Sequence, residues 1–281
     1  MAKLFTISEP ALLGSKNDRH PKEDWFAVSK KFPIYAVADG VTLEKNKLGH
    51  YPRSSGAQKV AQIFCDVAVK EAEKLYPKFK TSHLNRIFRT ANRAVGRYNR
   101  KRHRNKKTIN YWDLDLFAAT ASFALIKNNT LYWASICDAG IAHFDQRGRR
   151  TLLACQCWPN LQKNLPGNWN SFREKERKIR IRKDFRNALG PKGELKGYGV
   201  VTGEREAESY LNEGDLLIGA GDLIFLFSDG FEEYLKLEKF LHLFQKWPRD
   251  LTNKLKTLTA RKAKQDAESY GQERTLIAIS I

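Results

Sequence analysis

Short apolar runs separated by polar turns are the dominant pattern of this chain. Such runs, rich in β-branched and aromatic residues and bounded by turn residues, are typical of β-strands. The stretch EGDLLIGAGDLIFLFSDG (213–230) predicts two strands or one long hairpin. The other predicted strands are LFTIS, WFAV and IYAVA within residues 3–38, the runs at 117–126, 131–137 and 140–144, and TLIAISI at 275–281.

Two segments in the first half of the chain repeat their apolar residues with the period of a helix. The first begins after Ser54 or Ser55, either of which is a suitable N-cap, and it ends at Pro77. A third helical stretch covers roughly 236–268 and is interrupted near Pro248. The apolar positions are Ala57, Val60, Ala61, Phe64 and Ala68 in the first segment, and Leu84, Ile87, Phe88, Ala91, Val95 and Tyr98 in the second.

Strands at both ends of the chain, with two helices inserted together, predict an α+β layered fold: a β-sandwich flanked by paired helices. A length of 281 residues allows one large domain or two small ones. The region of about 145–205 is rich in basic residues, Asn, Pro and Gly, and has little periodicity. We therefore expect a single domain over 1–281 with a basic excursion at about 145–205, and not a second domain.

The chain carries a net charge of +19, from 50 Lys and Arg against 31 Asp and Glu. Such a surplus predicts attraction to polyanions. Arginines form a stripe on the second predicted helix, and no acidic residue occurs between Pro77 and Thr108. The stripe is either a solvated helix face or a docking surface for an acidic protein or nucleic acid. It consists of Arg86, Arg89, Arg93, Arg97 and Arg100.

The sequence contains no sign of a membrane segment. Its longest apolar runs are too short to cross a bilayer, and the N-terminus lacks the apolar stretch of a signal peptide. We therefore expect a cytoplasmic protein without membrane insertion.

Several other potential metal ligands form no recognisable site. The four cysteines lack the spacing of a zinc site, which favours reduced thiols, and the six histidines are scattered. Asp113 and Asp115 in YWDLDLF only superficially resemble a metal-binding pair. We interpret both as turn or edge residues.

Acidic residues stand at the ends of predicted strands, where Asp is rare because it is a poor strand former. Asp39 and Asp229 each follow an apolar run and precede a glycine, Asp138 follows WASIC, and Glu273 precedes the last strand. Any one of them alone is explained as a turn residue. If they meet at the ends of neighbouring strands, they repel one another unless a cation lies among them, and oxygen ligands suit Mg²⁺ or Mn²⁺.

The order of these motifs resembles the metal-dependent Ser/Thr protein phosphatases, known as the PPM or type 2C family. The resemblance spans nearly the whole chain and rests on the order and spacing of the motifs. It implies a central β-sandwich of two antiparallel sheets flanked by pairs of antiparallel helices, with a flap in the basic excursion. The motifs are RHPKED (19–24), VADG (37–40), SICDAG (135–140), NALG (187–190), LFSDGF (226–231) and GQERTLIAISI (271–281).

The resemblance also implies a site for two Mn²⁺ or Mg²⁺ ions, with a looser third ion in many members. Asp39 would bridge the two ions, and the backbone carbonyl of Gly40 would bind one of them. Asp229 and Glu273 would complete the pair. Asp138, together with Asp229, would hold the third ion.

Further residues receive roles around these ligands. Arg19 would hold the substrate phosphate, because a planar guanidinium matches a phosphate bidentately. Glu23 and Asp24 would hold metal-bound waters or lie behind the ligands, and Glu233 would support the third site. The implied activity is hydrolysis of phosphoserine and phosphothreonine in signalling proteins, by attack of a bridging, metal-activated water.

Two departures from the family pattern bear on activity. Val41-Thr42-Leu43 stands where relatives have Met-Gly-Gly or His-Gly-Gly, so the histidine proposed as general acid in eukaryotic members is absent. Glu273-Arg274 stands in place of Asp-Asn, which lengthens one ligand and brings a positive charge close by. The alternative interpretation is a weakly active or inactive protein of this fold that binds an acidic partner or nucleic acid through its basic surface.

Overall fold

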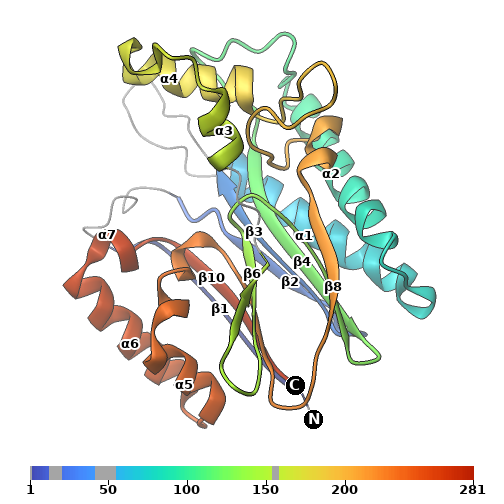
Figure 1. The fold of residues 1–281 in the computed structure, drawn as a ribbon, viewed down its shortest axis with the longest axis vertical. Helices are drawn as coiled ribbons and strands as arrows, with labels where there is room; N and C mark the ends of the chain where they lie inside the picture. The colour runs from blue at the N-terminus through green and yellow to red at the C-terminus, as the bar shows by residue number, and fades with distance from the viewer. Residues whose placement is uncertain (1, 13–20, 42–54, 154–157) are drawn as a thin grey trace.

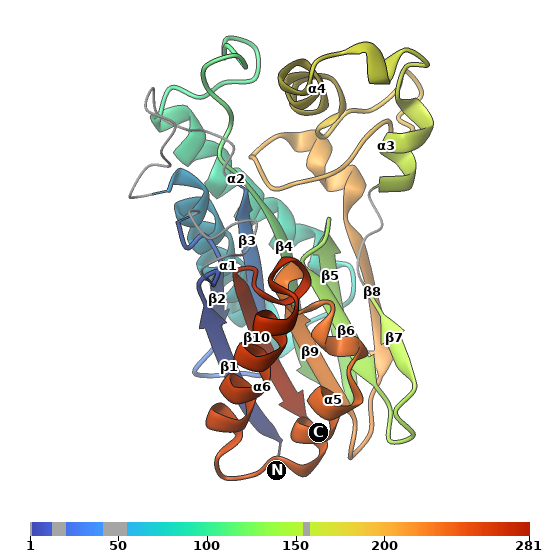
Figure 2. The same ribbon diagram turned by 90° about the vertical axis from the view of Figure 1, so that its left-hand side faces the viewer.

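The computed structural model describes residues 2–12, 21–41, 55–153 and 158–281. Two five-stranded antiparallel sheets pack face to face, and helices cover the outer face of each (Figures 1 and 2). This arrangement confirms the predicted α+β sandwich with paired helices. No helix in the described residues is both long and apolar enough to cross a membrane.

One sheet has the strand order β1-β10-β9-β6-β7 and the other has the order β2-β3-β4-β5-β8. Neighbouring strands are antiparallel throughout. The strands of the first sheet are β1 (Lys3–Glu9), β10 (Arg274–Ser280), β9 (Leu223–Phe227), β6 (Gly140–Phe144) and β7 (Arg150–Leu152). Those of the second are β2 (Trp25–Val28), β3 (Ile34–Val41), β4 (Ala118–Lys127), β5 (Thr130–Ile136) and β8 (Asn212–Leu217).

The stretch 213–230 forms two strands that belong to opposite sheets, so the hairpin alternative is wrong. β8 pairs with β5, whereas β9 lies between β10 and β6. Buried hydrogen bonds of Asp222 stabilise the crossing. Its carboxylate accepts from the amide of Gly219 at 2.9 Å and lies 2.8 Å from Nε2 of His143.

Two helices pack on each sheet. α1 (Gly56–Leu75) and α2 (His83–Lys101) cover the sheet that contains β3, and α5 (Glu238–Lys246) and α6 (Leu251–Gln265) cover the other. Ser55 is the N-cap of α1, since its hydroxyl accepts hydrogen bonds from the amides of Ala57 and Gln58. The break near Pro248 is present between α5 and α6. The shorter helices are α3 (Trp158–Asn164), α4 (Glu174–Arg180) and α7 (Ala267–Tyr270).

The two central strands with an Asp-Gly end are buried on both faces. On β3, Ile34, Ala36 and Ala38 pack against α1, while Tyr35 and Val37 face the opposite sheet. On β9, the aromatic residues Phe225 and Phe227 pack against α5 and α6, while Ile224 and Leu226 face inward. Burial on both faces explains the uninterrupted apolar runs. Alternation along β3 then directs Asp39 to the side that faces the other sheet.

The basic excursion contains short helices and is anchored to the domain by a buried acid. Asp115, in the irregular segment before β4, accepts from Arg186 at 2.8 Å and lies 3.4 Å from Arg182. Asp113 lies in a turn as expected, whereas Asp115 lies in the irregular segment after that turn, and its role as an anchor follows only from the structure. Two cations of the basic excursion therefore share one buried carboxylate inside the protein.

Candidate metal centre

Acidic side chains converge at one end of the sandwich. β3 and β9 finish there and β10 begins there, at the end away from the two chain termini (Figures 1 and 2). The pKa of Asp39 reflects this convergence. Burial raises it well above the usual value, and repulsion from the other acids of the cluster, Asp24, Asp229, Asp138 and Glu273, raises it further. The strand ends therefore meet as predicted, although β3 and β9 meet across the sandwich and not within one sheet.

Asp24 is the most deeply buried of these acids, with 1% of its surface exposed. Burial and repulsion from Glu273 raise its pKa to about 7, against the opposing effect of hydrogen bonds from Ser228 and Thr275. The Ser228 hydroxyl donates to its Oδ2 at 2.6 Å. Asp24 thus lies behind the cluster, tied to β9 and β10.

Glu273 is held by backbone amides. The amide of Glu23 donates to both carboxylate oxygens, at 2.8 and 2.9 Å, and the amide of Asp24 donates to Oε1 at 2.8 Å. Burial raises the pKa of Glu273 to about 7, with a further contribution from the charge of Glu23. The longer arm of a glutamate at this position reaches the segment before β2 and fixes it.

The positive charge of Arg274 is directed away from this cluster. Its side chain is 2% exposed, and its guanidinium bonds the carboxylate of Glu9 at 2.6 and 3.0 Å. The same guanidinium donates to the carbonyls of Tyr270 and Gln272. The charge that the sequence places beside Glu273 is therefore compensated by Glu9 on β1.

Both Asp-Gly glycines are required by close packing. A Cβ atom on Gly40 would lie 2.8 Å from the carbonyl carbon of Ala57 in the first turn of α1. A Cβ atom on Gly230 would lie 2.0 Å from the carbonyl oxygen of Glu273. Real Cβ atoms do not approach backbone atoms so closely, so each glycine lets a neighbouring segment reach the acidic cluster.

Asp138 follows β5 after a strained residue, Cys137, whose φ is +64°. Burial raises the pKa of Asp138, and the side chains of Thr120 and Cys137 oppose this shift. Its Oδ1 is buried and has no hydrogen-bond partner among the described residues. Thr120 pairs directly with Asp39 in the register of β3 and β4. The register of β4 thus places the side chain of Thr120 next to Asp39.

Asp229 lies at the rim of the cluster. Desolvation by the surrounding protein and repulsion from Asp138 and Asp24 raise its pKa to about 7, although the side chain is exposed and solvent weakens such effects. The adjacent Glu232 adds to this repulsion. Glu233, which the resemblance places near the third ion, forms an ion pair with Lys236.

Some predicted residues fall elsewhere. Arg19, Thr42 and Leu43 lie outside the described residues. In the arginine stripe, Arg86 pairs with Glu71 at 3.1 Å and Arg89 pairs with Glu208 at 2.9 Å. Sequence reasoning also missed the hydroxyls of Ser55 and Ser228, which donate to Glu23 and Asp24, since a lone Ser beside an acid is too common to be a signal.

The carboxylates of this cluster are chemically suited to bind a divalent cation, but their side chains are not yet arranged around one position. Among the described residues, no three His, Cys, Asp or Glu side chains are placed to hold an ion as they stand. The crowded groups are nevertheless all carboxylates with raised pKa values, and one buried oxygen of Asp138 has no partner. Such crowding is relieved by a hard divalent ion, which prefers oxygen ligands.

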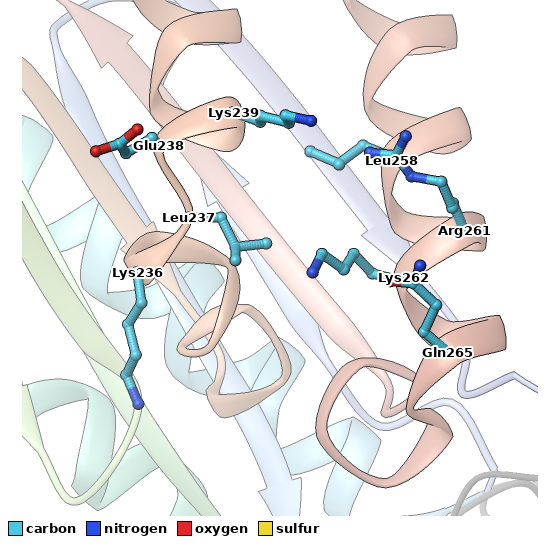
Figure 3. A pocket seen from close by; sticks show the side chains of 8 residues that line it. All are labelled: Lys236, Leu237, Glu238, Lys239, Leu258, Arg261, Lys262 and Gln265. Atoms are coloured by element: carbon cyan, nitrogen blue, oxygen red, sulfur yellow. The ribbon is translucent and has the colours of Figure 1, made fainter.

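A separate pocket of about 470 Å³ lies between α5 and α6 (Figure 3). The residues that line it include the cations Lys239, Arg261 and Lys262 and the apolar Leu237 and Leu258. None of the strand-end carboxylates is among its described lining residues, so we do not assign the acidic chemistry to this pocket.

No protein-family model and no curated protein matches this chain. Solved structures do match it over nearly its full length. The catalytic domain of the serine/threonine protein phosphatase PstP, in complex with two manganese ions, is 15% identical with a TM-score of 0.58, covering 99% of this chain and 97% of that one. The serine/threonine phosphatase of S. agalactiae is 14% identical, with a TM-score of 0.57 and coverage of 99% and 98%.

RsbX in complex with magnesium is 11% identical, with a TM-score of 0.50 and coverage of 99% of this chain and 94% of that chain. Identities this low establish a shared architecture and leave the chemistry to be argued from the residues. The chain has the fold of the PPM-type serine/threonine phosphatases.

Proposed function

We propose that this chain is a Mn²⁺- or Mg²⁺-dependent phosphatase that removes phosphate from phosphoserine and phosphothreonine in proteins. The observation that carries the proposal is the burial of Asp39 among Asp24, Asp138, Asp229 and Glu273. This cluster lies at a strand end of a fold that is shared with a phosphatase domain solved in complex with manganese. A cytoplasmic location, and one domain over 1–281 with a basic flap at about 145–205, remain predictions.

In this proposal, Asp39, Asp229 and Glu273 hold two ions together with the carbonyl of Gly40, and Asp138 contributes to a third. Divalent ions so held lower the pKa of a water molecule and neutralise charge on a phosphoryl group. The backbone amides of the segment before β2 keep the Glu273 carboxylate in one orientation.

The remaining residues act on the substrate and on the ligands. The hydrogen bond from Ser228 holds the carboxylate of Asp24 in place behind Asp39. Arg19 would hold the phosphate through its two parallel N–H groups. Val41 stands where some relatives carry a histidine, so we assign protonation of the leaving oxygen to solvent.

The test is release of phosphate from a phosphothreonine peptide by the purified chain, with EDTA, Mg²⁺ or Mn²⁺. We expect activity with at least one of the metals, none with EDTA, and none from Asp39→Asn. Asp113→Asn is the matched control, because Asp113 is an exposed acid outside the cluster. Absence of activity from folded protein with either metal would refute the proposal.

The second candidate, binding of an acidic partner or nucleic acid, is favoured by one part of the arginine stripe. Its last three arginines are exposed and form no ion pair within the described residues, whereas the first two are paired. Binding of a single-stranded oligonucleotide should then weaken steeply as salt rises, and it should depend on the unpaired arginines. Fluorescence anisotropy would compare the wild type with a triple alanine variant of Arg93, Arg97 and Arg100.

A further inference from the structure

A polar pocket of about 520 Å³ lies where the start of α1, the end of α2 and the approach to β4 meet. Lys59, Arg102 and Arg104 line it, together with Gln58 and Gln62. None of its described lining residues is acidic. Lys59 in the first turn of α1 and Arg102 and Arg104 at the end of α2 therefore bring three positive charges to one cavity, an arrangement that attracts anions.

The cations are held in place by side-chain contacts that leave them positively charged. The guanidinium of Arg104 lies 3.8 Å from the ring centre of Phe117, and that of Arg102 lies 5.6 Å from the ring centre of Tyr98. Lys59 donates to the side-chain oxygen of Gln62 at 2.8 Å. A guanidinium also presents a planar N–H edge whose geometry matches a carboxylate.

The pocket borders the acidic cluster. Ser55, which lines the pocket, donates a hydrogen bond to the side chain of Glu23. The first turn of α1 also packs against Gly40, whose Cβ position is blocked by the backbone of Ala57. A peptide whose phosphorylated residue reaches Asp39 therefore has its neighbouring residues close to these cations.

We propose that this pocket binds a carboxylate side chain of the substrate, so that the protein prefers phosphoserine or phosphothreonine flanked by acidic residues. The inference rests on the proposed function and specifies its substrate class. The pocket attracts the anion while the adjacent cluster receives the phosphate.

The experiment compares three phosphothreonine peptides of equal length: one with acidic residues before the phosphothreonine, one with acidic residues after it, and one neutral. kcat/KM is measured with Mn²⁺ for the wild type and for the double variant Lys59→Ala with Arg102→Ala. Arg104 is left intact because it also donates to the carbonyl of Asp115. The control is Lys239→Ala with Arg261→Ala, which removes the same charge from the α5–α6 pocket.

We expect one acidic peptide to be preferred, and the pocket variant to lower its kcat/KM by about three- to tenfold, the size of two partly exposed charge pairs. The neutral peptide should change little, and the control variant should behave as the wild type. Equal kcat/KM for all three peptides, or equal losses in both variants, would overturn the proposal.

A failure of the phosphatase assignment remains distinguishable from a failure of the pocket. If no peptide is hydrolysed, anisotropy with the same labelled peptides tests the pocket through binding alone. Tighter binding of an acidic peptide that is lost with Lys59→Ala and Arg102→Ala would support the pocket. Binding without preference among the peptides would refute it.

Discussion

The hydroxyl of Ser228 donates a 2.6 Å hydrogen bond to the buried carboxylate of Asp24. The same oxygen accepts a 2.8 Å bond from the amide of Thr275. One side chain therefore joins the end of β9, the start of β10 and the segment before β2, which are far apart along the chain. Asp24 has little access to water, so these protein groups replace its solvation.

We expect Ser228→Ala to lower the free energy of unfolding by about 1–3 kcal/mol, because a buried carboxylate and a buried amide each lose a partner. Urea denaturation followed by circular dichroism measures the change. Ser82→Ala is the control, since Ser82 is exposed and makes no capping bond, and its effect should stay within about 0.5 kcal/mol. Equal stability of Ser228→Ala and wild type would contradict this role of the hydroxyl.

The raised pKa values predict how stability depends on pH. Asp24, Asp229 and Glu273 have pKa values of about 7 in the folded chain, against 3.8, 3.8 and 4.5 ordinarily. The folded protein holds protons there that the unfolded chain has released, so stability falls as pH rises from about 4 to about 7. Without divalent ions, we expect the melting temperature to decrease between pH 5 and pH 8.

The same reasoning predicts that Mn²⁺ raises the melting temperature more at pH 8 than at pH 5, because ions compete with protons for the carboxylates. Differential scanning fluorimetry with EDTA or Mn²⁺ measures both effects. Asp39→Asn removes one charge from the cluster, so it should flatten the pH dependence in EDTA and reduce the response to Mn²⁺. A melting temperature in EDTA that rises from pH 5 to pH 8 would show that this cluster does not determine how the stability depends on pH.

The acidic cluster could be predicted from the sequence because each of its strand ends is marked by a short local motif. An apolar run followed by Asp-Gly marks a strand end wherever it occurs, so Asp39 and Asp229 are recognisable without tertiary structure. Their supporting partners are not local, since Ser228 reaches Asp24 only through the pairing of β9 with β10. Nothing in the residues around Asp24 indicates that partner.

The crossing from β8 to β9 shows the same limit for the fold. Two apolar runs separated by Gly219 and Gly221 fit a hairpin and a change of sheet equally well. The choice depends on which strands are already in place: β5 offers an edge to β8, while β10 and β6 leave a central position for β9. That competition is a property of the whole sandwich, and the local pattern does not contain it.

Gly230→Ala should be damaging, because the added methyl carbon would lie 2.0 Å from the carbonyl oxygen of Glu273. Either the turn after β9 or the start of β10 must move, which shifts two proposed ligands at once. We expect a loss of about 1–3 kcal/mol in unfolding free energy, typical of overpacking, and weaker binding of Mn²⁺ in calorimetry. Gly167→Ala, with no atom within 4 Å of its added carbon, should change neither quantity. An unchanged affinity for Mn²⁺ in Gly230→Ala would show that the turn after β9 does not position the metal ligands.

Asp115 and Asp113 provide a matched pair for testing how the basic excursion is attached. Asp115→Asn leaves Arg186, which is 2% exposed, without its closest counter-charge, because its remaining acid, Glu204, is 3.8 Å away. Breaking a buried pair by removing one partner typically costs about 3–5 kcal/mol, so Asp115→Asn should be among the most destabilising single changes. Asp113→Asn alters an exposed acid two residues away and should cost about 0.5 kcal/mol or less. Urea denaturation gives both values, and limited proteolysis should cut within 158–211 faster in Asp115→Asn. If both variants unfold at the wild-type urea concentration, the excursion is held by its other contacts and not by this ion pair.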